Sequence, residues 1–306
     1  MGETGDAPSV FGLLSDRTRV DILCAMAEAQ LDVGGSGSGP VELGFSEIYD
    51  RVEVDNTSKL SYHLGELTGT FLLKRGDGYA FNHAGEQIVR FILAENYGEP
   101  ERIGSVDLDG RCLFCGDSEL QAGLHDQFFF VRCQACDRPV LGQPVTPAQT
   151  RREDAEAVVR SVRRRQVVFG RQFQQQQCPE CGGLLPSDAR RIRTISMGDT
   201  EMFVVTDECR ECLRQYNGPL RYRVAYHPAS IAFHWDRGTD VTSQGAWEFH
   251  EHVLEDRWRS SKVGEDPAEY EVVYDYDTES LRFRLDKHAR VTETERARRH
   301  EGFSDR

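Results

Sequence analysis

The chain has 306 residues, of which 39% are hydrophobic and 29% are charged, and this balance suits two or three folded domains of about 100 residues each. No run approaches the roughly 20 apolar residues that span a bilayer, and residues 1–10 lack the basic start and apolar middle of a secretion signal, so we expect a cytoplasmic protein with no membrane partner. The net charge of −14 by itself disfavours nucleic acid as a partner, because affinity for phosphate comes from Lys and Arg side chains.

The positive charge is carried almost entirely by arginine. Acidic residues outnumber basic ones 51 to 37, and only four residues are lysines: Lys59, Lys74, Lys262 and Lys287. This composition resembles that of proteins from salt-loving archaea. In a salty cytoplasm counterion release contributes little, so DNA binding would depend on base contacts, DNA shape and a local basic patch. Net charge therefore does not decide between DNA and other partners.

Residues 8–95 predict four helices, a hairpin and a further helix. Val10–Leu14 suggest a short first helix, and Asp16 occupies an N-cap position before a second helix that ends near Gln30. The glycine and serine residues of 34–39 predict a surface loop. Phe45–Val52 then give the apolar stripe of a short third helix.

A fourth helix is expected to begin at residues 55–58 and to run to Leu67. Leu60, Leu64 and Leu67 recur at helical spacing, which turns them to the core. The polar residues between them are left on or beside the outward face: Ser58, Lys59, Ser61, Tyr62 and His63.

A β-hairpin and one more helix follow. Phe71–Arg75 and Tyr79–Phe81 flank Gly76-Asp77-Gly78, a combination typical of a tight hairpin turn. Residues 88–93 then predict a helix that is apolar enough on one side to pack against a partner chain.

Two segments of this region resemble the ArsR-like winged-helix regulators. They are LLSDRTRVDIL at residues 13–23 and SKLSYHLGEL at residues 58–67. The resemblance implies a winged helix-turn-helix whose fourth helix enters the major groove of double-stranded DNA and whose hairpin meets phosphate or the minor groove. Carried over by position, the DNA contacts would be Thr57, Ser58, Lys59, Ser61, Tyr62 and His63 in the helix and Lys74 and Arg75 in the hairpin.

Two departures from the family pattern bear on how such a helix docks. Residues 34–39 lengthen one loop, and Gly65 weakens the fourth helix by up to about 1 kcal/mol relative to alanine. A winged helix that binds protein or only dimerises is the open alternative, since fold alone does not determine function. Metal-sensing relatives need cysteines in the third helix or paired Asp and His in the last, which this chain lacks, so we interpret Cys24 as a small buried residue.

The other eight cysteines form four CxxC pairs. The four pairs form two groups, and in each group a strand-like segment lies between the two pairs. The first group is Cys112, Cys115, Cys133 and Cys136, with Phe128–Val131 between its pairs; the second is Cys178, Cys181, Cys209 and Cys212, with Met202–Val205 between its pairs. This repeated unit predicts two zinc ribbons, each with one structural zinc ion in a Cys₄ site. Redox-active pairs and iron–sulfur ligation are the alternatives, but a redox CxxC usually stands alone beside a βαβ unit. Because four thiolates leave no open position on the metal, we expect no catalysis and no enzyme.

One helix is predicted between the ribbons, from about residue 146 or 150 to Phe169. Two groups of arginines accompany it: Arg160, Arg163, Arg164 and Arg165, and then Arg190, Arg191 and Arg193. We favour a solvated surface balanced by the surrounding acids over a nucleic-acid patch, which is the alternative.

After Cys212 the patterns are weaker. His227–Trp235 predict a helix that Trp247–Leu254 could continue, and residues 270–276 with 281–285 predict a β-hairpin. His250-Glu251-His252 does not have the spacing of a zinc-protease motif, so we interpret the two histidines as surface residues. We expect the tail from Glu293 to be frayed.

Together these elements predict an α+β protein: a winged helix-turn-helix (8–95), a linker (96–110), a first zinc ribbon (111–145), a connecting helix (146–172), a second ribbon (173–222), a mixed carboxy-terminal region (223–292) and a tail (293–306). The arrangement resembles haloarchaeal regulators. It leads us to expect a homodimeric DNA-binding transcriptional regulator whose ribbons contact an effector, a partner or the twin chain. The alternative is a general transcription component that binds RNA polymerase, resembling archaeal transcription factor E.

Overall fold

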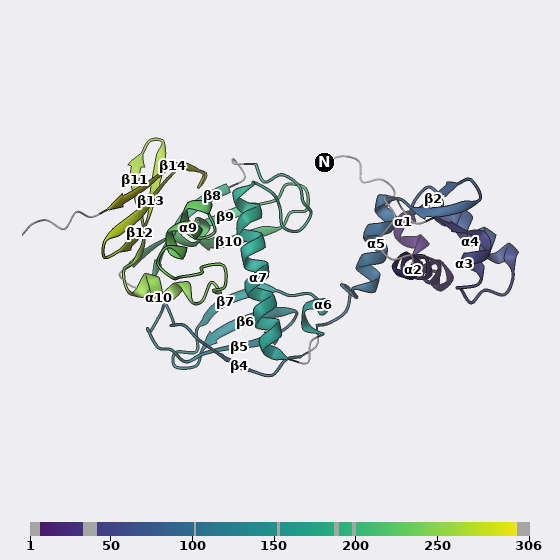
Figure 1. Ribbon diagram of the computed structural model, residues 1–306, viewed down its shortest axis with the longest axis horizontal. Coiled ribbons are helices and arrows are strands. Elements are labelled where there is room, and N and C mark those ends of the chain that lie inside the picture. The colour runs from purple at the N-terminus through teal and green to yellow at the C-terminus, as the bar shows by residue number, and fades with distance from the viewer. Residues whose placement is uncertain are drawn as a thin grey trace, which may run out of the picture. The chain divides into compact units, whose positions relative to one another are not determined.

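The computed structural model describes residues 7–32, 42–100, 102–151, 154–186, 190–197 and 200–298. The protein has a mixed α+β fold and divides into two compact units, residues 1–99 and 100–306 (Figure 1). The glycine-serine loop expected at residues 34–39 lies outside the described residues. None of the described helices is both long and apolar enough to cross a membrane.

The amino-terminal unit contains the four helices, hairpin and last helix that the sequence predicts. Its elements are α1 (Ala7–Leu13), α2 (Arg17–Asp32), β1 (Leu43–Gly44), α3 (Phe45–Tyr49), α4 (Thr57–Leu67), β2 (Leu72–Arg75), β3 (Gly78–Phe81) and α5 (His83–Leu93). The short strand β1 was not anticipated; it pairs antiparallel with β3, so the hairpin becomes a three-stranded sheet in the order β1-β3-β2.

Helix α4 is anchored at its start and along one face. The side chain of Asn56 accepts a hydrogen bond from the Lys59 amide at 2.9 Å, which caps the helix where the sequence predicted its start. Leu60, Leu64 and Leu67 are completely buried, as their spacing predicted. The helix is therefore held with one face in the core and the opposite face in solvent.

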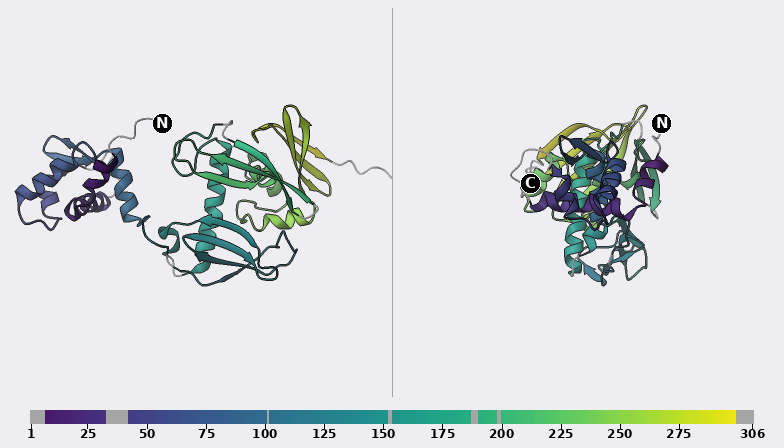
Figure 2. Two further views of the ribbon diagram at one scale, coloured as in Figure 1. Left: turned by 180° about the vertical axis from the view of Figure 1, so that it is seen from behind. Right: turned by 90° about the vertical axis from the view of Figure 1, so that its right-hand side faces the viewer.

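The carboxy-terminal unit holds three antiparallel sheets (Figure 2). The first consists of β4 (Val106–Leu108), β5 (Leu120–His125), β6 (Phe128–Cys133) and β7 (Pro139–Pro144); after helices α6 (Pro147–Thr150) and α7 (Ala155–Gln174), the second consists of β8 (Arg190–Met197), β9 (Thr200–Glu208) and β10 (Gln215–Pro219). Helices α8 (Leu220–Arg223), α9 (Pro228–Trp235) and α10 (Phe249–Leu254) precede the third sheet of β11 (Trp258–Glu265), β12 (Ala268–Tyr276), β13 (Glu279–Leu285) and β14 (Val291–Arg298). The predicted hairpin is the β12–β13 pair.

Two cores connect parts of this unit that are distant in sequence. Phe129 of β6 packs on Trp247, which precedes α10, with the two rings 5.9 Å apart. On the other side, Phe203 of β9 contacts Tyr270 of β12 at a ring separation of 5.4 Å, and both belong to the largest buried cluster. The second and third sheets thus share one core with α8, α9 and α10.

Two predictions about helices are wrong. The single helix expected between the cysteine modules is two helices, because α6 ends at Thr150 and the carboxylate of Asp154 caps a new helix by accepting from the Glu156 amide at 2.9 Å. Similarly, α9 ends at Trp235, and residues 249–254 form the separate helix α10.

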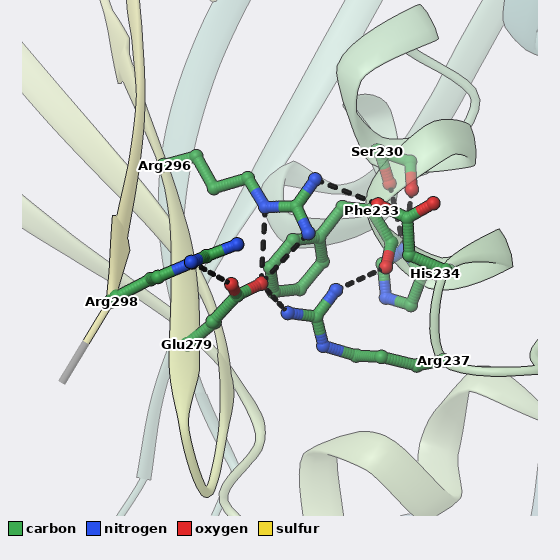
Figure 3. A network of polar contacts seen from close by, with 8 residues as sticks. Ser230, Phe233, His234, Arg237, Glu279, Arg296 and Arg298 are labelled. Atoms are coloured by element: carbon green, nitrogen blue, oxygen red, sulfur yellow. Dashed lines mark hydrogen bonds and ion pairs between the residues drawn. The ribbon is translucent and has the colours of Figure 1, made fainter. Parts of the chain in front are cut away.

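The tail predicted to fray from Glu293 instead forms strand β14, which pairs with β13 along its length as far as Arg298. A cluster of ion pairs explains this (Figure 3). The buried carboxylate of Glu279 accepts from Arg296 at 2.8 Å, from Arg298 at 2.8 Å and from Arg237. Hydrogen bonds from Arg296 and the other two arginines lower the pKa of Glu279 to about 2, so the carboxylate stays charged and holds the last strand on the sheet.

Candidate metal centres and nucleic-acid interface

The first cysteine group lies at one end of the first sheet. Cys112 and Cys115 lie in the loop before β5, Cys133 ends β6, and Cys136 lies in the turn to β7. The Cys112–Cys136 and Cys115–Cys133 sulfur pairs are 3.7 and 3.6 Å apart. A tetrahedron built on Zn–S bonds of about 2.3 Å has edges of about 3.8 Å, so these two separations match a zinc site, and all four sulfurs lie within 4.8 Å of one another.

The second group repeats this arrangement around β8 and β9. Its sulfurs pair as Cys178–Cys212 at 3.7 Å and Cys181–Cys209 at 3.6 Å. The hydroxyl of Tyr216 lies 3.8 Å from the Cys178 sulfur, a neighbour that the sequence analysis missed because nothing in its spacing marks it.

The first CxxC turn of each group has the same backbone. The amide of Gly116 donates to the Cys112 carbonyl at 2.8 Å, and the amide of Gly182 donates to the Cys178 carbonyl at 2.9 Å. Both glycines have positive φ, +78° and +73°, a conformation that side chains disfavour. One glycine directly after the second cysteine thus lets the first CxxC turn of each group close on its metal, whereas Asp137 and Leu213 take up a positive φ after the second turns.

These are the two groups of metal-ligating residues found in the described part of the chain, and they could hold two structural metal ions, for which zinc is well suited. In each group two of the cysteines are buried. Desolvation raises the pKa of Cys112 to about 12, so binding there requires the cation itself to displace the thiol protons. Cys24 is half-buried in α2 and is a member of neither group.

His250 and His252 are buried rather than at the surface, which corrects the interpretation of that motif. The ring of His250 lies 3.2 Å from the Arg111 carbonyl, next to Cys112. His252 stacks on Trp258 with the ring centres 4.8 Å apart. Burial lowers the pKa of both histidines to about 4. Their alternation with Glu251 looked like a surface pattern, but the short helix α10 packs against neighbours on two sides.

The proposed DNA contacts fall mostly on exposed surface. Among the predicted contacts, those exposed in α4 are Thr57, Ser58, Lys59, Ser61 and Tyr62, and those exposed in β2 are Lys74 and Arg75. His63 is the exception and corrects the prediction, since it is 4% exposed. It lies three residues after Leu60 and four before Leu67, on the same buried stripe, where its ring contacts Tyr62 and approaches Asp16 at 3.9 Å.

Neighbouring acidic side chains partly neutralise the positive charge of this surface. The ammonium of Lys59 is 2.8 Å from the carboxylate of Asp55, and the hydrogen bond between them raises the pKa of Lys59. Arg19, which lies over the Tyr62 ring, is paired with Glu66 at 3.3 Å. The exposed face of α4 is therefore polar with little net positive charge.

Three arginines of the two predicted groups in the other unit form ion pairs with acids. Arg160 contacts Asp154 at 2.9 Å, and Arg163 contacts Glu248 at 3.0 Å. Arg190 is 5% exposed and pairs with the buried Asp207, so the expectation that this group is solvated is wrong for Arg190. The reason is that β8 and β9 bring the two side chains together in a core. The buried pair of Arg190 with Asp207 leaves Arg190 no access to nucleic acid.

Comparison with protein-family models gives two matches. Residues 109–291, more than half of the chain, match the family described as "Domain of unknown function (DUF7351)". Residues 7–92 match the family described as "Domain of unknown function (DUF7347)". No curated protein and no solved structure matches the chain.

Proposed function

We propose that this chain, which belongs to the DUF7351 family, is a DNA-binding transcriptional regulator of the cytoplasm. In the proposal the amino-terminal unit is a winged helix-turn-helix, the two cysteine groups are zinc ribbons, and the protein is not an enzyme. The observation that carries the proposal is helix α4, a helix buried on one face and polar on the other, followed directly by a hairpin with two exposed cations.

The geometry of α4 supports a role in recognising DNA through the major groove. Three leucines of its inner face are completely buried, and Asn56 caps its first turn, so the helix has little freedom to move. The major groove of DNA admits one α-helix, and hydroxyl, ammonium and phenol groups are donors and acceptors that base edges and phosphates use. Ser61 and the 58% exposed Tyr62 lie one turn after the helix start, with Lys59 between them and the cap.

The charges predict how such binding would respond to salt. Lys59 is paired with Asp55, so among the proposed contacts the cations without an acidic partner in the described part of the chain are Lys74 and Arg75 of the hairpin. Few free cations therefore face the DNA, so few counterions are displaced and affinity falls gently as salt rises. That behaviour suits a protein working at high salt.

Exposed aromatic and aliphatic side chains support a homodimer as part of the proposal. On α5 and just after it, Phe91, Leu93 and Tyr97 are 43%, 45% and 66% exposed, and Phe11 of α1 is 66% exposed. The rings of Phe91 and Tyr97 lie 6.0 Å apart, and exposed apolar side chains gathered in this way mark sites of association. A two-fold dimer places two copies of α4 on two half-sites of a palindrome.

The metal sites support a structural and not a catalytic role for the other unit. Each group supplies four thiolates, which complete the tetrahedral coordination of zinc and leave no position for water or substrate. We therefore assign the two ions to holding together small sheets and loops.

The test is selection of bound fragments from random duplex DNA with the purified full chain, at molar salt. The wild type is expected to enrich a palindromic motif. A Lys59→Ala, Ser61→Ala, Tyr62→Ala triple variant should bind that motif at least tenfold more weakly, because each lost contact is worth about 1–3 kcal/mol. The matched control is Ser261→Ala, Lys262→Ala, which removes exposed side chains of the same kinds from β11. Enrichment of no motif, or equal binding by the triple variant, refutes the proposal.

A further inference from the structure

A cavity of about 570 Å³ lies within the carboxy-terminal unit, where elements from both cysteine modules meet. Its walls come from β7, which follows Cys136, from the second half of α7, from β10, which follows Cys212, and from α8 and α10. This volume falls in the range of pockets that hold small molecules.

Aromatic rings form much of the wall. Phe173 and Tyr216 meet edge to face with centres 5.0 Å apart, and Tyr222 and Phe249 do so at 5.5 Å. Phe169 packs against Tyr216 as well. Rings arranged in this way offer flat apolar surfaces to a planar guest.

Several lining residues also carry buried polar atoms that have no hydrogen-bond partner among the described residues. They are Gln143 Nε2, Arg214 Nε, Arg223 Nε, Tyr222 Oη and Tyr226 Oη. Buried polar groups are nearly always hydrogen-bonded in folded proteins. Three of the five atoms can only donate, and the two hydroxyls can donate, so the missing partner is an acceptor.

The charges around the cavity favour an anionic acceptor. Arg223 lines it and shares the carboxylate of Asp207 with Arg190, so one acid serves two guanidinium groups. Arg214 also lines the cavity, and Glu180 is the one acid among the lining residues of the described chain. Cations therefore exceed acids at this wall.

We propose that this cavity binds a small aromatic carboxylate, with its ring between the aromatic walls and its oxygens accepting hydrogen bonds from the unpartnered donors. A ligand bound in the cavity would contact residues that neighbour both metal sites. Tyr216 contacts the Cys178 sulfur at 3.8 Å, and His250, another lining residue, contacts the carbonyl next to Cys112 at 3.2 Å. That the ligand acts as an effector of DNA binding rests on the proposed function, whereas its binding does not.

Calorimetric titration of the zinc-loaded full chain with benzoate, phenylacetate, indole-3-acetate and 2-naphthoate tests the binding. At least one is expected to bind one molecule per chain and to compete with the others, and the cationic 2-naphthylmethylamine should not bind. If none of the four acids saturates the protein at millimolar concentration, the proposal is overturned.

Two variants locate the site. Gly218 lines the cavity in β10, and a side chain added there meets no atom within 4 Å, so Gly218→Leu should fill the cavity and weaken binding at least tenfold. Gly123→Leu is the matched control, because Gly123 also lies within a strand with open space at its Cβ position but is not a lining residue. A double Tyr222→Phe, Tyr226→Phe variant should bind the acid at least fivefold more weakly while keeping two zinc ions. Equal binding by wild type and Gly218→Leu, both with two zinc ions, also overturns the proposal.

The same ligands are then added to the DNA-binding assay. A change in DNA affinity that Gly218→Leu abolishes supports an effector role. Binding by calorimetry without any change in DNA affinity keeps the site and rejects the effector role, and failure of DNA binding leaves the calorimetric result unaffected.

Discussion

Replacing Asp207 by asparagine should strongly destabilise the carboxy-terminal unit. Asp207 is 1% exposed and pairs with both Arg190 and Arg223, whose side chains are 5% and 12% exposed. Asparagine keeps the shape of the side chain and removes its charge. Both guanidinium groups then stay buried with no negative partner at this position.

The cost follows from the burial of the three groups. Removing one partner of a buried ion pair typically costs about 3–5 kcal/mol, because the remaining charge is left uncompensated. Burial lowers the pKa of Arg190 to about 10, so it is still charged at pH 7 and cannot escape the penalty by losing its proton. Since a whole domain is stable by about 5–15 kcal/mol, this one change should remove a large part of the stability.

Tryptophan fluorescence during urea unfolding measures this effect selectively. Trp235, Trp247 and Trp258 are the three tryptophans of the chain, and all belong to the carboxy-terminal unit. Unfolding is followed with zinc present, so that loss of metal does not dominate.

The control is Asp154→Asn. Asp154 also pairs with an arginine, but its side chain is 55% exposed, and asparagine caps a helix as well as aspartate does. We expect the control to unfold with the same urea midpoint as the wild type. If Asp207→Asn also unfolds there, the reasoning from buried charge is refuted.

Three further predictions concern metal, pH and assembly. Cys178→Ser should reduce the zinc content from two ions to one and lower the stability of the carboxy-terminal unit, while α1–α5 stay as stable as in the wild type; two ions in the purified variant would show that Cys178 is not a zinc ligand. Burial lowers the pKa of His234 to about 4, so the unfolded chain binds its proton first and stability falls as the pH drops below about 6.5. Between pH 6.5 and 5.5 the stability advantage of wild type over His234→Asn should shrink by about 1 kcal/mol, and an equal pH dependence in the two proteins would contradict the burial argument. Phe91→Asp should convert the dimer to monomers, as measured by light scattering, whereas Val168→Asp, at a comparably exposed site on α7, should leave the dimer intact. A wild-type protein that is already monomeric would refute the proposed dimer.

The metal sites were predictable because their signal is local. Each CxxC turn is encoded in four adjacent residues, and Gly116 and Gly182 follow directly after the turns. The buried face of α4 was equally visible, since Leu60, Leu64 and Leu67 follow the helical period. His63 was misplaced because it is polar, although it stands on the same stripe as the leucines.

The remaining features depend on contacts between distant residues. Strand β14 has seven exposed residues out of eight, so it carries no alternating pattern, and what holds it is the pairing of Arg296 and Arg298 with Glu279. The cavity takes its walls from residues between Phe128 and His250, and no short segment contains enough of them to signal a pocket. The Asp207 pairs likewise appear only when β8, β9 and α8 come together.

The central claim is tested most directly by recovering crosslinked DNA from cells at their native salt. The experiment compares wild type with the triple variant in which Lys59, Ser61 and Tyr62 are replaced by alanine. The account predicts sharp peaks that share a palindromic motif and that disappear in the variant. Broad occupancy of all active promoters that does not depend on α4 would contradict it, and would indicate instead a general factor that reaches DNA through RNA polymerase.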